Sequence, residues 1–64
     1  MKRIVVTFDC KHWHFVRAFL VANRVQYCMS VYTLTCEVRV SVPRAKGVAL
    51  LAELRRVSVP YRLV

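Results

Sequence analysis

Cys10, His12 and His14 form the densest group of potential metal ligands in the sequence. Zinc needs three or four converging side chains, usually thiolates and imidazoles. If these residues begin a helix, Cys10 and His14 share a face one turn apart, but His12 points about 160° away from His14. No second pair with suitable spacing follows. We therefore expect buried thiols, with no metal site and no cofactor.

Asp9 could be the carboxylate of a metal-dependent nuclease or, more simply, a helix N-cap. A magnesium site usually needs more than one carboxylate, and we expect Glu37 and Glu53 to lie out of its reach. Cysteine–histidine catalysis at Cys10 would lack an orienting third group, and a single glycine rules out a glycine-rich phosphate loop. We predict a protein that is not an enzyme and has no catalytic residue.

One resemblance bears on Asp9. The strand ending at Asp9, the stretch Arg24-Val25-Gln26-Tyr27 and the stretch Ser30-Val31-Tyr32 are similar to the Cas2 family of small ferredoxin-like dimers. In some Cas2 proteins an aspartate at that place serves metal-dependent phosphodiester cleavage. The likeness covers these short stretches only, and the chain is much shorter than that family. It implies a nuclease as a weaker alternative.

The elements that would carry these residues begin with a strand over residues 3–8, where Ile4, Val6 and Phe8 alternate with more polar positions. A helix from Cys10 to about Asn23 should follow the Asp9 cap. At 100° per residue its apolar residues form one face and its polar residues another. The expected inner face is Phe15, Val16, Phe19 and Ala22, and the expected outer face is Trp13, His14, Arg17, Val21 and Arg24.

Residues 25–42 are typical of strand throughout, which is too long for one strand of a small domain and predicts a hidden hairpin. Its apolar residues fall into one set at odd positions, 25 to 31, and a second at even positions, 34 to 42. Both sets face one core only if paired residue numbers add to an odd total. A two-residue turn at Tyr32-Thr33 or Thr33-Leu34 meets that condition. It also places Cys28 and Cys36 on opposite sheet faces, which excludes a disulfide between them.

Pro43 suits the first turn of a second helix, extending to about Arg56, with Gly47, Leu50, Leu51 and Leu54 facing inward. A last strand over residues 57–64 contains Pro60, which assigns it to a sheet edge. The order β-α-β-β-α-β predicts an α+β fold of the ferredoxin-like type, with two helices on one face of a four-stranded antiparallel sheet.

The chain of 64 residues, 58% of them hydrophobic, is long enough for a single domain, 1–64. A core this small barely offsets the entropy of ordering the chain, so we expect a homo-oligomer, most simply a dimer. No apolar run approaches the roughly 18 residues of a membrane span. The first apolar run stops at Asp9, too early for a signal peptide. The odd number of cysteines indicates free thiols and a cytoplasmic location.

The strongest functional signal is charge: eleven Lys and Arg residues oppose three acidic ones. We expect cations on both helices to form one surface for phosphates, with Trp13 stacking on bases, while the opposite side is comparatively neutral. An acidic protein partner and plain solvation are the alternatives. The predicted binding residues are Trp13, His14, Arg17, Arg24, Arg44, Lys46, Arg55 and Arg56.

The open face of the sheet offers a second surface. Its central strands lack the aromatic residues with which RNA-recognition motifs stack on bases, so that class is not expected. The face is mixed enough to serve as a dimer or partner interface, with Val5, Tyr32 and Arg39 at its centre. The leading hypothesis is therefore a small basic module that binds nucleic acid. The alternative is an inhibitor or adaptor, of a phage or mobile-element type, that docks on an acidic protein.

Overall fold

In the computed structural model, which describes residues 2–64, the first strand lies where its sequence pattern predicts it. Strand β1, Arg3–Asp9, buries Val6 and Phe8 as predicted, but Thr7 between them is buried as well, so exposure does not alternate along the strand. The Asp9 carboxylate accepts a hydrogen bond from the backbone N–H of Lys11 at 2.9 Å, which confirms the predicted N-cap. A 3-10 turn, η1 (Cys10–His12), leads into helix α1 (Trp13–Ala22).

The predicted inner face of α1 is partly wrong. Val16 and Leu20 are fully buried, Phe15 and Phe19 are half-buried, and Ala22 is exposed. Apolar residues occupy most sides of this helix, so their spacing alone does not define one face. The 3-10 turn also advances about 120° per residue rather than 100°, which rotates the faces that follow it.

The hairpin has the predicted odd parity, but both its register and its loop differ from the prediction. Strand β2, Cys28–Tyr32, pairs with β3, Glu37–Pro43, and Met29 lies opposite Val40, so the odd total is confirmed. The loop, however, comprises the four residues 33–36 instead of two. Cys36 at its end has φ 52°, a left-handed conformation that directs the chain into β3. Leu34 consequently projects into solvent, and its predicted place in the core is wrong.

Helix α2 spans Arg44–Arg56 and presents the predicted inner face, with Gly47, Leu50 and Leu54 buried and Leu51 half-buried. Pro43 is the N-cap rather than a first-turn residue. The final strand, β4, is only Tyr61–Leu63. It is shorter than predicted because residues 57–59 complete the end of α2: the backbone N–H of Val59 donates to the carbonyl of Leu54 at 2.9 Å.

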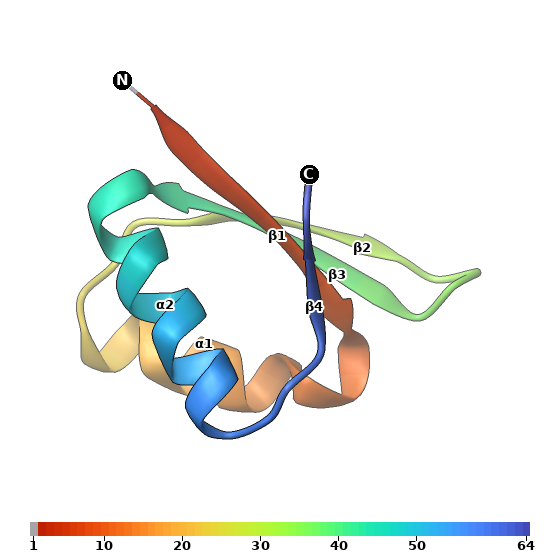
Figure 1. The fold of residues 1–64 in the computed structure, drawn as a ribbon. Coiled ribbons are helices and arrows are strands. Elements are labelled where there is room, and N and C mark those ends of the chain that lie inside the picture. Colours follow the sequence, from red (N-terminus) through yellow and green to blue (C-terminus); the bar gives the residue numbers. More distant parts are fainter. Residues whose placement is uncertain (1) are drawn as a thin grey trace.

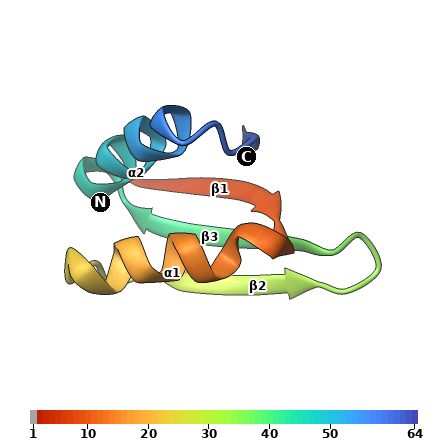
Figure 2. The same ribbon diagram turned by 90° about the horizontal axis from the view of Figure 1, so that it is seen from below.

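The strands form an antiparallel sheet in the order β2-β3-β1-β4, which leaves β2 and β4 at the edges. Both helices cover the same face of this sheet, and the other face is open (Figures 1 and 2). The core between them is made mainly of Val and Leu side chains from β1, β3, α1 and α2. Neither helix in residues 2–64 has the length and apolar composition that crossing a bilayer requires.

Candidate functional site

Five exposed cations lie at one end of the fold, where β1 and α2 begin and α1 ends (Figure 2). The start of the chain touches the start of α2, because the backbone N–H of Arg44 donates to the carbonyl of Lys2 at 3.3 Å. None of the three acidic residues belongs to this region. We call it the basic end: Lys2, Arg3, Arg24, Arg44 and Lys46.

Arg24 occupies a conformation in which glycine is the usual residue. It has φ 53° and stands just after the C-cap of α1. Its backbone N–H donates to the carbonyl of Val21 at 3.1 Å, and that of Val25 donates to Leu20 at 2.9 Å. This is the Schellman arrangement that ends many helices. A non-glycine residue in this conformation costs stability, so a long cation is held here against local preference.

The start of α2 also departs from the usual rules. Its first turn contains no acidic residue, and its N-cap, Pro43, offers no side chain to accept from the free backbone N–H groups. Arg44 and Lys46 instead add positive charge where the helix macrodipole is already positive. An anion bound here would relieve both the unpaired donors and the repulsion.

The opposite end of β1 is different. Asp9, Lys11, His12, Glu37 and Arg62 line a cavity of about 550 Å³, and we call this region the mixed end. Arg62 pairs with Glu37 at 2.5 Å. Asp9 and Glu37 are direct cross-strand partners, so the expectation that Glu37 lies out of reach of Asp9 is wrong. Here acids and cations compensate each other.

Two of the predicted binding arginines already have partners in the chain. Arg55 donates from Nε to the Tyr61 hydroxyl at 2.9 Å. Arg56 donates to both carboxylate oxygens of Glu53, the shorter contact being 2.6 Å. These hydrogen bonds hold the pKa of Glu53 below its ordinary value and raise the pKa of Arg56. The C-terminal turn of α2 is therefore less available to a phosphate than its N-terminal turn.

The remaining predicted residues lie on α1. Trp13 was expected on the outer face, but it is half-buried and packs against Phe8 and Tyr27, with ring centroids 6.5 and 5.8 Å away. That packing occupies the indole that was expected to stack on a base, so the outward placement is wrong. His14 and Arg17 are exposed as predicted.

The predicted contrast between a basic helix face and a neutral sheet face is wrong. Arg3, Arg39 and Arg62 all stand on the open face, as the β1–β3 and β1–β4 registers show. The contrast runs along the strands instead. From Arg3 to Asp9 the chain advances about 20 Å, more than twice the Debye length of about 8 Å in physiological salt. The acids of the mixed end therefore barely offset the charge of the basic end.

The predicted interface residues share the open face but differ in exposure. Arg39 lies over the Tyr32 ring, 5.0 Å from its centroid, and both side chains are exposed. They also line a cavity of about 470 Å³ beside the hairpin loop. Val5 is half-buried, and its carbonyl accepts from the backbone N–H of Val64 at 3.0 Å.

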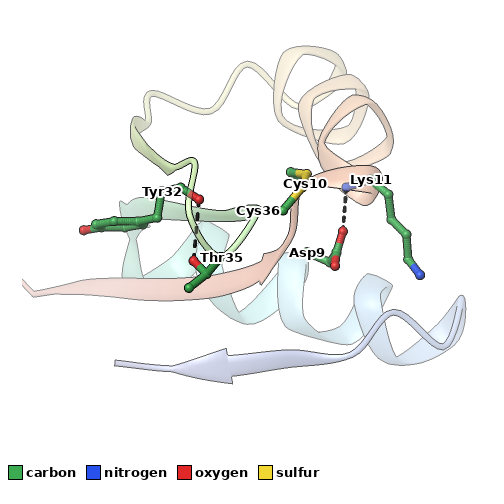
Figure 3. Close-up of a disulfide and its surroundings, with 6 residues drawn as sticks. All are labelled: Asp9, Cys10, Lys11, Tyr32, Thr35 and Cys36. Atoms are coloured by element: carbon green, nitrogen blue, oxygen red, sulfur yellow. Dashed lines mark hydrogen bonds between the residues drawn. A yellow bond between two sulfur atoms is a disulfide. The ribbon is translucent and has the colours of Figure 1, made fainter.

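The expectation that all the cysteines are free thiols is wrong. Cys10 and Cys36 form a disulfide (Figure 3) with a Cα–Cα separation of 5.4 Å. Cys28 is free and exposed. Because Asp9 pairs with Glu37, the next residues outward, Cys10 and Cys36, meet when the register is extended. The Cys10 backbone N–H donates to the Cys36 carbonyl at 2.8 Å. The odd cysteine count therefore gives no support for the predicted reducing compartment.

Comparisons with known proteins add no relative: no protein-family model, no curated protein and no solved structure matches the chain.

Proposed function

We propose that this protein binds nucleic acid through the phosphate backbone, using the basic end as its contact surface. The element order and the β2-β3-β1-β4 sheet support a ferredoxin-like plait as the scaffold. Five exposed cations without an acidic neighbour carry the proposal, and two of them lie at the start of α2, which has no side-chain cap.

The number of exposed cations without an acidic partner supports a polyanion as the binding partner. All eleven cations are exposed, and within residues 2–64 only Arg56 and Arg62 form ion pairs. A chain that needed charge only for solubility could place cations anywhere on its surface. Here cations are retained at the two positions described above, Arg24 and the first turn of α2, where they cost stability. Such local conflicts are typical of functional sites.

Phosphate contacts at this surface would come from two kinds of donor. The guanidinium groups of Arg24 and Arg44 can donate two parallel hydrogen bonds to one phosphate. The free backbone N–H groups of the first turn of α2 can receive a second phosphate, with Lys46 beside them. These contacts read the backbone and not the bases, so binding should be largely independent of sequence.

A second copy of the chain is the partner that we propose for the open face and for edge strand β2. All five β2 residues are exposed. The apolar Met29 and Val31 lie on the helix side of this edge strand, opposite Val40 and Val38, and are exposed although the sequence predicted that they face the core. A dimer would double the number of basic ends that one nucleic acid could contact.

The test is fluorescence anisotropy with labelled single-stranded and duplex DNA of unrelated sequences over a range of salt concentrations. If five cations engage phosphates, log affinity against log salt should have a slope of about −3.5 for single strands and about −4.5 for duplex. A flat slope would reject the proposal. Salt-sensitive capture of an acidic protein, without any DNA or RNA binding, would replace nucleic acid by protein as the partner.

Arg44→Glu and Lys11→Glu make a matched pair of variants. Each puts an acid into the first turn of a helical segment, one at the basic end and one at the mixed end. Arg44→Glu should weaken binding by at least about tenfold and make the salt slope shallower by about 1. Lys11→Glu should leave the slope unchanged. An equal loss of DNA affinity in the two variants would mean that the position of the charge on the surface does not matter, which contradicts a localised site.

A further inference from the structure

We propose that Cys10, Cys36 and Asp9 form a redox-controlled site for a thiophilic divalent cation such as Zn²⁺. When the disulfide is reduced, the two thiolates and the Asp9 carboxylate become the ligands. The two sulfur atoms and one Asp9 oxygen all lie within 4.8 Å of one another. This inference is independent of nucleic-acid binding, because the site lies at the mixed end.

The spacing fits tetrahedral coordination. With Zn–S distances of about 2.3 Å, two thiolates on one zinc ion stand about 3.8 Å apart, so the sulfurs must separate by about 1.8 Å once the disulfide is reduced. Two soft thiolates select Zn²⁺, Cd²⁺ or Co²⁺ over Mg²⁺ and Ca²⁺. Three protein ligands leave the fourth position to water or a small anion.

The backbone already holds these ligands together without the disulfide. The hydrogen bond from Cys10 N–H to the Cys36 carbonyl and the Asp9–Glu37 pairing fix the ends of β1 and β3 side by side. Asp9 uses one oxygen to cap the turn at Lys11, which orients the carboxylate and leaves its second oxygen outside that hydrogen bond (Figure 3). Cys36 and Asp9 are exposed and Cys10 is half-buried, so both a reductant and a metal ion can reach the site.

The two chemical steps balance separately. A dithiol or phosphine reductant supplies two electrons, two protons complete the Cys10 and Cys36 thiols, and the reductant is oxidised. Zinc binding then forms two S–Zn bonds and one O–Zn bond to the Asp9 carboxylate in place of metal-bound waters, and releases the two thiol protons, with no change of oxidation state. The metal thus replaces the disulfide as the link between the hairpin loop and the 3-10 turn η1.

The experiment is titration of the phosphine-reduced wild-type protein with Co²⁺, followed by displacement with Zn²⁺. We expect a saturable near-ultraviolet thiolate-to-cobalt band at one equivalent, absent from the oxidised protein. Cys10→Ser and Cys36→Ser should abolish the band, whereas Cys28→Ser is the matched control and should retain it. No band, or a band lost equally in Cys28→Ser, would overturn the proposal.

Two readouts remain if a cysteine variant fails to fold. Asp9→Asn keeps an N-cap of equal quality but removes the anionic ligand, so metal affinity should fall by at least about tenfold. In the reduced wild type, zinc should protect Cys10 and Cys36 from maleimide while Cys28 reacts, giving one added label by intact mass instead of three. Full labelling in the presence of zinc would contradict the site.

Discussion

The two ends of β1 are held to the rest of the fold in opposite ways, and the difference shows which of them is free to bind. At the mixed end, acids balance cations, and a disulfide joins the hairpin loop to the 3-10 turn η1. At the basic end no acid and no cross-link is present, yet α2 approaches β1 more closely there than a Cβ atom would allow. Rigidity at the basic end therefore comes from packing. Arg3 donates hydrogen bonds to the hydroxyl and the carbonyl of Ser41, but no acid neutralises any cation of this end.

Breaking the cross-link should produce the largest effect. In the chain-entropy model a disulfide that spans 26 residues contributes about 3.5 kcal/mol, so Cys10→Ser with Cys36→Ser should lower the free energy of unfolding by roughly that amount. Cys28→Ser, at an exposed free thiol, is the control and should change it by less than about 0.5 kcal/mol. Urea denaturation in the presence of a chelator measures both, and equal stabilities would show that the cross-link does not hold the mixed end.

Adding a side chain where α2 packs against β1 at the basic end should have the next largest effect on stability. A Cβ on Gly47 would lie 2.8 Å from Cδ1 and 2.9 Å from Cβ of Ile4, and the latter atom is fixed by the β1 backbone. Gly47→Ala should therefore destabilise the fold by about 1–3 kcal/mol, although alanine is ordinarily better in a helix by about 1 kcal/mol. Ala49→Gly, at an exposed position of the same helix, measures that ordinary preference. Stabilisation by Gly47→Ala would contradict the close approach.

The smallest expected changes in stability come from two glycine substitutions, only one of which should also change DNA binding. Arg24 and Ser58 have φ 53° and 60° and occupy equivalent positions after α1 and α2. Because glycine adopts this conformation without steric cost, Arg24→Gly and Ser58→Gly should each stabilise the fold by about 1 kcal/mol. Only Arg24→Gly should weaken DNA binding, since it alone removes a cation from the basic end. If Arg24→Gly binds DNA as tightly as wild type, this residue is not part of the contact surface.

The sequence predicts those parts of the fold whose patterns are local. Alternation identified β1, and the Asp9 cap needed only its two following residues. Parity required an odd pairing total for β2 and β3, which is observed, but it did not select the particular register that places Met29 opposite Val40. The inner face of α2 was also predictable, because Gly47 and the three leucines of the helix lie on one side. Each of these features depends on neighbours in the chain.

The errors come from features that depend on distant pairing. The register of β1 with β3 was not predicted, so neither the Asp9–Glu37 pair nor the Cys10–Cys36 bond could be derived. The hairpin loop lacks glycine and asparagine, which would have located it, and Leu34 was assigned inward for that reason. Apolar residues on most sides of α1 hid the true position of Trp13. For the site, the cations were identified, but their division between two ends is a property of the topology.

The place of the disulfide in the β1–β3 ladder has a consequence for strand alignment. A slip of one position would turn every side chain of one strand to the wrong face, and it would also put Cys10 opposite a residue other than Cys36. Formation of the disulfide therefore depends on the β1–β3 register, because only the correct register brings these two side chains together. A short glycine turn fixes the register of two strands that follow each other in the chain. Here β1 and β3 are separated by a helix and a hairpin, and the disulfide fixes their register instead.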